Sequence, residues 1–195
     1  MPASRLDQVL ERIDAANRED PHEEVAGGIA SPREHLYATR LTDWVLRLRP
    51  EASEALRIAA RGQHIRRWTI PRERYERTRR GYLRWREVLK AFHAEQVTQL
   101  MRDVGYPDDL IERVRLLILK KHLGTDSEAQ TLEDALCLVF LETQFEELKR
   151  KTPEESMREI VRKTWRKMSA RAREEALRLP LSVETKRWLS EALKE

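Results

Sequence analysis

The chain has 195 residues, of which 40% are hydrophobic, so it is long enough to bury the core of one domain. Charged residues make up 37% of the chain but leave a net charge of only +4, which indicates solvated helix faces of mixed sign rather than a polyanion-binding protein as a whole. No apolar run approaches a membrane span or a signal peptide, and the single cysteine, Cys137, excludes an intrachain disulfide, so we expect a cytoplasmic protein with no membrane partner.

Glycine and proline are scarce and the apolar residues recur every three or four positions, which predicts helices throughout and no strand pair. Ser4 is the expected cap of the first helix, and residues 20–32 are expected to form a loop. Ser31 followed by Pro32 is typical of the start of the second helix, and Gly105 of a helix end. In chain order, the expected helices cover about 5–16, 32–49, 52–66, 72–104, 108–121, 131–149, 153–177 and 183–193.

No linker or low-complexity segment divides the chain, so we expect one all-α domain over residues 1–195. Its core should lie at about 31–150, followed by a C-terminal helical extension at 151–195. The extension carries no recognisable chemistry, and we expect it to pack on the core or on a second copy of the chain in a homo-oligomer.

Four histidines, His35, His64, His93 and His122, fall on or beside successive predicted helices, and Asp134 follows in an apolar stretch. Imidazoles and a carboxylate that converge from different helices can hold a divalent metal ion, here Mn, Fe, Co, Ni, Zn or Mg. Each histidine taken alone is more often a hydrogen-bonded or exposed side chain, and Asp134 could equally be a first-turn charge of its helix.

Four stretches carry a resemblance to a known superfamily: EHLYATRLTDWVL, RIAARGQHIRRW, the run from FHAEQV to LILKKH, and LEDALCLVFLE. Their order resembles the HD-domain superfamily of helical metal-dependent phosphohydrolases. More narrowly, nearly the whole chain is similar to the family called domain of unknown function four-two-zero-two. The resemblance implies an HD-like helical bundle with two metal sites. The primary metal would be held by His35, His64 and Asp134. A second metal would be held by His93 and His122.

The resemblance also implies a phosphohydrolase acting on a nucleotide or another small phosphorylated metabolite. Its general acid would be His93 or His122, and Arg67 falls where many members have a lysine that contacts the substrate phosphate. Arg61, Gln63 and Arg66 lie beside His64 and would also meet the substrate. The chain departs from the superfamily at the His-Asp doublet, which is replaced by Gln63-His64.

The segment from Arg61 to Lys90 holds eleven Lys or Arg residues against three Glu, interleaved with Trp68, Tyr75, Tyr82 and Trp85. Such a segment admits an RNA or nucleotide partner. The aromatic spacing is also typical of a stripe that faces the core, with the arginines outward. There are two alternatives to the phosphohydrolase. The histidines could hold two irons in an oxygenase of the HD type. Alternatively, the protein is a non-catalytic module that binds RNA or protein through the basic segment.

Overall fold

The computed structural model describes residues 3–194, and this part of the chain is mostly helical, as the sequence predicts. A two-stranded sheet, β1 (Glu23–Ala26) and β2 (Ile29–Pro32), is its only departure from helix and turn within the described residues. The helices are α1 (Arg5–Arg18), α2 (Arg33–Leu48), α3 (Glu54–Gly62), α4 (Arg79–Val104), α5 (Asp108–Ile118), α6 (Ser127–Val139), α7 (Phe145–Lys151), α8 (Glu154–Lys167), α9 (Ala170–Arg178) and α10 (Val183–Lys194). Short 3-10 turns cover Arg67–Thr69 and Arg72–Arg74, and a π-helical turn over Phe140–Gln144 joins α6 to α7.

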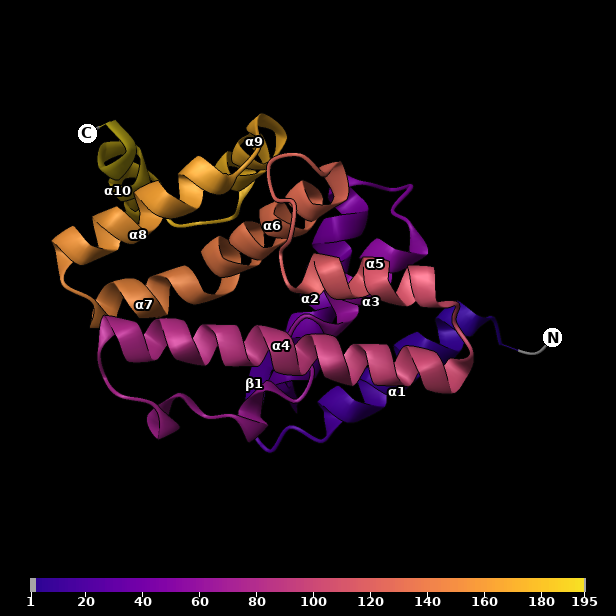
Figure 1. Cartoon of the computed structure of the whole chain (residues 1–195). Coiled ribbons are helices and arrows are strands. Elements are labelled where there is room, and N and C mark those ends of the chain that lie inside the picture. Colours follow the sequence, from indigo (N-terminus) through magenta and orange to yellow (C-terminus); the bar gives the residue numbers. More distant parts are fainter. Residues whose placement is uncertain (1–2, 195) are drawn as a thin grey trace.

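The helices pack in two groups (Figure 1). In the first group, α3 contacts α2 and α5, while α1 and α5 both pack on the long helix α4. In the second group, α8 and α9 pack on α6, and α10 packs on α8. Helix α6 joins the groups because it also packs along α2. One apolar core runs through both groups, from Val9 of α1 to Ala172 of α9, so the C-terminal helices belong to the same packed unit.

Local capping explains where several helices begin and end. Ser4 caps α1 as expected, in a capping box completed by Asp7. Gly105 ends α4 in the left-handed conformation, with φ of 83°. Ser31, by contrast, does not cap α2: it lies in β2, and Pro32 occupies the cap position without a side-chain hydrogen bond.

The prediction of a loop over residues 20–32 is wrong, because this segment forms an antiparallel hairpin. Ala26 pairs with Ile29, which leaves Gly27 and Gly28 as a two-residue turn with φ of 58° and 82°. Two residues with positive φ match the twist of paired strands, and glycine adopts that conformation without strain. The Gly27-Gly28 pair is therefore the sequence feature that indicates this hairpin.

The predicted ends of two helices are also corrected by packing. Helix α3 ends at Gly62 rather than near Arg66, at a point where a Cβ on Gly62 would lie 2.2 Å from Val97 Cγ2 of α4. Helix α4 starts at Arg79 rather than near 72, because the hydroxyl of Thr78 caps it. A further break, capped by Ser169, divides the helix predicted at 153–177 into α8 and α9. None of the described helices is long and apolar enough to span a bilayer.

Candidate functional site

Five side chains from three parts of the fold meet around His64, and we call them the His64 cluster: Glu34, Tyr37, His64, Arg67 and His93. Glu34 and Tyr37 lie one turn apart on α2, His64 and Arg67 follow the end of α3, and His93 is on α4. The Tyr37 ring stacks on the His64 ring, with centroids 4.0 Å apart and planes at 8°. The His64 and His93 rings have centroids 5.9 Å apart. Stacking on Tyr37 therefore fixes the plane of the His64 imidazole.

Two buried imidazole nitrogens in the cluster lack a hydrogen-bond partner. His64 Nδ1 lies 3.3 Å from Glu34 Oε2 but forms no hydrogen bond. His93 Nδ1 lies 2.9 Å from the Ile65 carbonyl oxygen, which can only accept, so this nitrogen carries the proton. His93 Nε2 is then a lone-pair acceptor without a partner, on a residue that is 2% exposed. Buried polar atoms are rarely left unpaired, so these nitrogens mark a place for a water molecule or a ligand.

Burial controls the protonation of the cluster. It raises the pKa of Glu34 to about 7, against the opposing charge of Arg67, which has its Nε 3.9 Å from Glu34 Oε1. Burial also lowers the pKa of His93 to about 3 and that of His64 well below its usual value. Both imidazoles are therefore neutral at pH 7, and Glu34 is the group that exchanges a proton near neutrality. A pKa of about 3 does not suit the general-acid role predicted for His93.

Three cationic side chains lie near His64: Arg67 within the cluster, and Arg86 and Lys120 outside it. The charges of Arg67, Arg86 and Lys120 all lie close enough to lower the pKa of His64 further. The Arg67 guanidinium lies over the Trp85 ring, 4.7 Å from its centroid. Lys120 Nζ is 2.7 Å from Glu133 Oε2. Cations therefore outnumber the carboxylates that face them, and such a site favours an anion.

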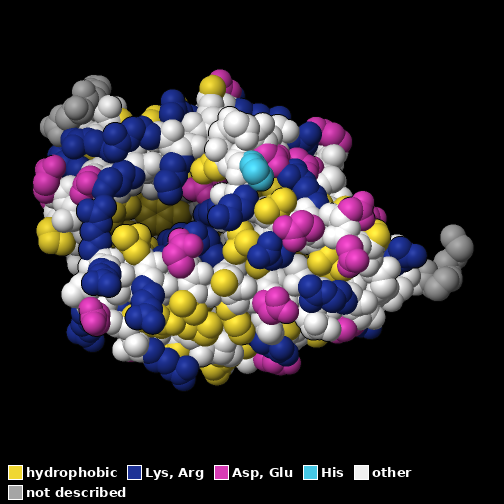
Figure 2. Space-filling model, in the orientation of Figure 1, with side chains coloured by type: hydrophobic (Ala, Val, Ile, Leu, Met, Phe, Trp, Pro, Cys, Tyr) yellow, Lys and Arg dark blue, Asp and Glu magenta, His cyan; other side chains and the backbone are white. Residues whose placement is uncertain are grey.

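Figure 2 shows a hollow on the face of the molecule where Figure 1 shows α4, α7 and α8. Lys and Arg side chains line its rim and hydrophobic side chains form its floor. Arg86 belongs to α4, and Lys167, at the end of α8, has its Nζ 3.3 Å from Glu133 Oε1. Glu133 pairs with both Lys120 and Lys167, and burial together with the charges of Arg86 and Lys167 lowers the pKa of Lys120.

His35 and Arg61 do not join the cluster. Arg61 donates from Nε and Nη2 to the two carboxylate oxygens of Asp14 on α1, at 2.5 and 2.7 Å. His35 Nδ1 lies 3.7 Å from the same carboxylate. Both side chains therefore face α1. The charge of Arg61 is paired with Asp14 inside the fold, and its role as a substrate ligand stays a prediction of the sequence.

His122 and Asp134 are also placed apart from the cluster. His122 is exposed in the turn after α5, with φ of 60°, and its carbonyl oxygen accepts from two later amides. Asp134 is buried, and its Oδ1 accepts from the Ser169 amide at 2.8 Å and from Gln130 Nε2 at 2.9 Å. Asp134 thus holds the start of α9 on α6. The carboxylate of α6 that reaches Lys120 belongs to the preceding residue, Glu133.

The structure brings together only two of the five predicted metal ligands, His64 and His93. Over residues 3–194, no three side chains of His, Cys, Asp or Glu are arranged to hold a metal ion. The set of His35, His64, His93, His122 and Asp134 is therefore not assembled into one site. The divalent metal ion and the di-iron alternative stay predictions of the sequence.

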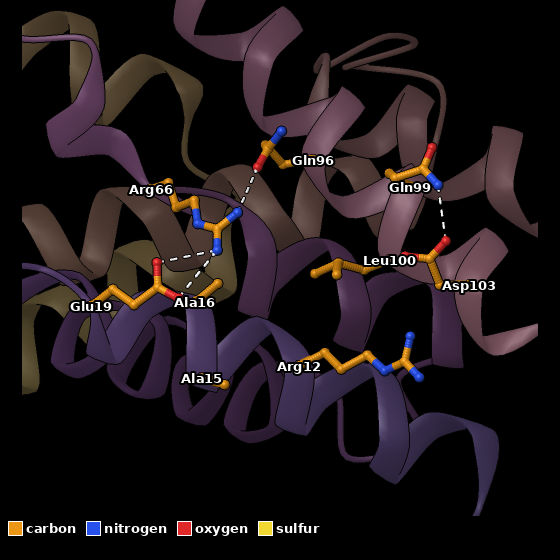
Figure 3. Close-up of a pocket in the computed structure, with 9 residues that line it drawn as sticks. All are labelled: Arg12, Ala15, Ala16, Glu19, Arg66, Gln96, Gln99, Leu100 and Asp103. Atoms are coloured by element: carbon orange, nitrogen blue, oxygen red, sulfur yellow. Dashed lines mark hydrogen bonds and ion pairs between the residues drawn. The ribbon is translucent and has the colours of Figure 1, made fainter.

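The remaining predicted ligands, Gln63 and Arg66, have separate environments. Gln63 is 4% exposed, and its buried Oε1 has no hydrogen-bond partner. Arg66 turns toward a groove of about 420 Å³ between α1 and α4, where it pairs with Glu19 at 3.1 Å and donates to Gln96 at 3.2 Å (Figure 3). Arg66 therefore points away from its neighbour Arg67, and of the predicted phosphate-binding arginines only Arg67 joins the His64 cluster.

The sequence did not identify Glu34, Tyr37, Arg86 and Lys120 as site residues. Glu34 and Tyr37 flank His35 in the sequence, and their spacing of three places them on one helix face. Arg86 was one basic residue among many in its segment. Lys120 carried no signal of its own, because its burial beside Glu133 depends on how α5 meets α6.

Comparison with known families identifies one match, described as Domain of unknown function (DUF4202), over residues 7–188. Neither the curated proteins nor the solved structures contain a match to the chain. The family match spans nearly the whole sequence and includes the entire His64 cluster and the Asp14–Arg61 pair. The chain therefore belongs to the DUF4202 family.

Proposed function

We propose that the protein binds a small phosphorylated molecule, such as a nucleotide, at the His64 cluster and hydrolyses its phosphate ester. One observation carries the proposal: two buried, unpartnered imidazole nitrogens lie near the charges of Arg67, Arg86 and Lys120, of which Lys120 is paired with Glu133. Lone pairs and cations in one place suit a ligand that offers both negative oxygens and hydroxyl donors. A phosphate ester of a small alcohol has both.

Charge favours the binding step. Arg67, Arg86 and Lys120 lie near His64, whereas Glu34 has a pKa of about 7 and so is only partly ionised at neutral pH. A phosphate monoester carries about −1.5 to −2 charges at pH 7. The planar guanidinium of Arg67 can donate two parallel hydrogen bonds to such a group. Partial burial of the site strengthens these attractions relative to water.

Glu34 supplies the proton acceptor for hydrolysis. Its carboxylate takes a proton from a water molecule as the water oxygen attacks phosphorus, and the bond from phosphorus to the ester oxygen breaks. The leaving oxygen takes up one proton, returned by Glu34, so the products are the alcohol and inorganic phosphate. The cations stabilise the charge that spreads over the phosphoryl oxygens during this step.

We also propose three features that the sequence resemblance implies. They are an HD-like arrangement of the helices, dependence on a divalent metal ion, and a cytoplasmic location. Since the described residues include no three-ligand group, no step above uses a metal.

The test is release of inorganic phosphate from a panel of nucleotides and sugar phosphates by the purified full-length protein. Each substrate is assayed with chelator and with Mn, Fe, Co, Ni, Zn or Mg added. We expect at least one substrate to be hydrolysed, with a rate that rises through pH 7 as Glu34 ionises. Glu34→Gln should remove that ionisation from the pH profile and lower kcat.

Arg67 and Arg66 offer a matched pair of variants. Arg67→Gln should lower kcat/KM by about 100-fold or more, because an oriented charge is lost from the transition state. Arg66→Gln removes an equal charge one residue away, at a side chain paired with Glu19, and should change kcat/KM less than about threefold. Phosphate release from no substrate, or release that survives Arg67→Gln and Glu34→Gln, would refute the proposal.

A further inference from the structure

A second cavity, of about 690 Å³, opens where the loop before α4 meets the first turns of that helix. We call it the Arg80 cleft. Its lining residues are Ile70, Arg74, Tyr75, Glu76, Arg80, Gly81 and Arg84. None of them belongs to the His64 cluster, and the volume lies in the range of small-ligand sites.

The Arg80 cleft is strongly basic. Arg80 and Arg84 lie one turn apart on α4, and Arg74 faces them from the 3-10 turn of the loop, against the single carboxylate of Glu76. All three arginines are exposed. Among residues 3–194, no hydrogen bond or ion pair occupies the guanidinium groups of Arg80 and Arg84. Unlike Arg61, these two arginines are free to bind a phosphate.

The loop wall of the cleft is held in place by three contacts. Gly81 packs so closely that a Cβ there would lie 2.2 Å from the Glu76 carbonyl oxygen. Arg72 donates to the carbonyl oxygens of Tyr75 at 2.8 Å and Glu76 at 2.6 Å. Trp85 Nε1 donates to the Ile70 carbonyl oxygen at 2.9 Å. The cleft is therefore formed before any ligand arrives, which reduces the ordering cost of binding.

We infer that the Arg80 cleft binds single-stranded RNA, with Arg74, Arg80 and Arg84 on consecutive phosphates and the Tyr75 ring stacked on a base. A guanidinium cluster recognises phosphate, and an aromatic ring beside it accepts any base. Exposed cations continue past the cleft at Arg77 and Arg79. A strand presents a row of phosphates to such a row of cations, whereas a free nucleotide would use only part of it.

The experiment is fluorescence anisotropy of a labelled oligouridylate of about twelve nucleotides, a length within known single-strand site sizes. Three phosphate contacts predict a slope of about −2 for log affinity against log salt, or about 20-fold weaker binding between about 50 and 200 mM salt. The Arg80→Ala/Arg84→Ala double variant should bind at least about tenfold more weakly and reduce the slope to about −0.7. Failure of the wild-type protein to bind would overturn the inference.

Matched controls separate the cleft from overall charge. Arg115→Ala/Arg187→Ala removes two exposed arginines from α5 and α10 and should leave affinity within about twofold. Equal loss in both double variants would show non-specific attraction and would overturn the site. Tyr75→Phe should retain binding and Tyr75→Ala should weaken it at least fivefold, because stacking is worth about 1–3 kcal/mol per base.

Competition distinguishes the sources of the phosphate. Uridine monophosphate that displaces the strand as well as an unlabelled strand does would identify a free nucleotide as the ligand and overturn the RNA assignment. Inorganic phosphate that competes equally well would overturn the role of Tyr75. Phosphate release measured on the same variants keeps the two sites apart, because changes in the Arg80 cleft should leave hydrolysis at the His64 cluster unchanged.

Discussion

Replacement of Glu34 by glutamine should stabilise the folded protein above neutral pH and have a much smaller effect in acid. Burial raises the pKa of Glu34 from its ordinary 4.5 to about 7, so between these pH values the folded protein keeps a proton that the unfolded chain releases. The wild type therefore loses stability as pH rises through 4.5, and the loss is complete above about 7. The interval between 4.5 and about 7, at about 1.4 kcal/mol per pKa unit, corresponds to about 3 kcal/mol.

Urea unfolding of wild type and Glu34→Gln, compared from about pH 4.5 to 8, measures this effect. Groups that titrate in both proteins cancel, so the free-energy difference between the two should grow by about 3 kcal/mol over that range. Glu51→Gln is the matched control, because its side chain is 76% exposed and should show no such growth. A difference that stays constant with pH would show that the pKa of Glu34 is not raised in the folded protein, and would refute the predicted rise of the hydrolysis rate through pH 7.

Two further predictions concern packing and capping. Gly62→Ala should destabilise the fold by about 1–3 kcal/mol in urea unfolding, because the new Cβ would lie 2.2 Å from Val97 Cγ2. Adding Val97→Ala should recover part of this lost stability. A Gly62→Ala variant as stable as the wild type would contradict the close crossing of α3 and α4. Asp126→Ala should cost about 1–2 kcal/mol near neutral pH, since the Asp126 carboxylate pairs with Arg113 and also accepts from the amides of Glu128 and Ala129 at the start of α6. Because the pKa of Asp126 is lowered to about 2, this contribution is present above its ordinary 3.8 and should fade toward pH 2; a difference that persists in acid would exclude the carboxylate as its source.

Helix content and several helix ends could be predicted because the responsible signals are local. Ser4 and Gly105 act within one turn of the residues they cap, so their sequence context is sufficient. The end of α3 is different, since it depends on Gly62 meeting Val97, a residue 35 positions away in the chain. The hairpin at Gly27-Gly28 did have a local signal, but its strands are only four residues long and show little apolar alternation.

The candidate site was predictable only in part, for a related reason. Sequence placed His64 and Arg67 together because they are three residues apart, and the resemblance added His93. Whether a buried charge is paired could not be derived from its neighbours in the chain. Arg61 and Arg67 look alike in the sequence, but Arg61 forms two hydrogen bonds with Asp14, whereas Arg67 has only a longer contact with Glu34, at 3.9 Å.

The basic segment from Arg61 to Lys90 contributes residues to both proposed sites, and Trp85 lies between them. The Arg67 guanidinium of the His64 cluster lies over the buried Trp85 ring, and Trp85 Nε1 donates a hydrogen bond to the Ile70 carbonyl oxygen at the Arg80 cleft. On α4, Arg84 lines the cleft and Arg86 acts on His64. Residues two apart on a helix are separated by about 200° around its axis, so this helix presents cations to opposite sides. If both proposals hold, the arginine density of the segment reflects two phosphate-binding sites on opposite sides of Trp85.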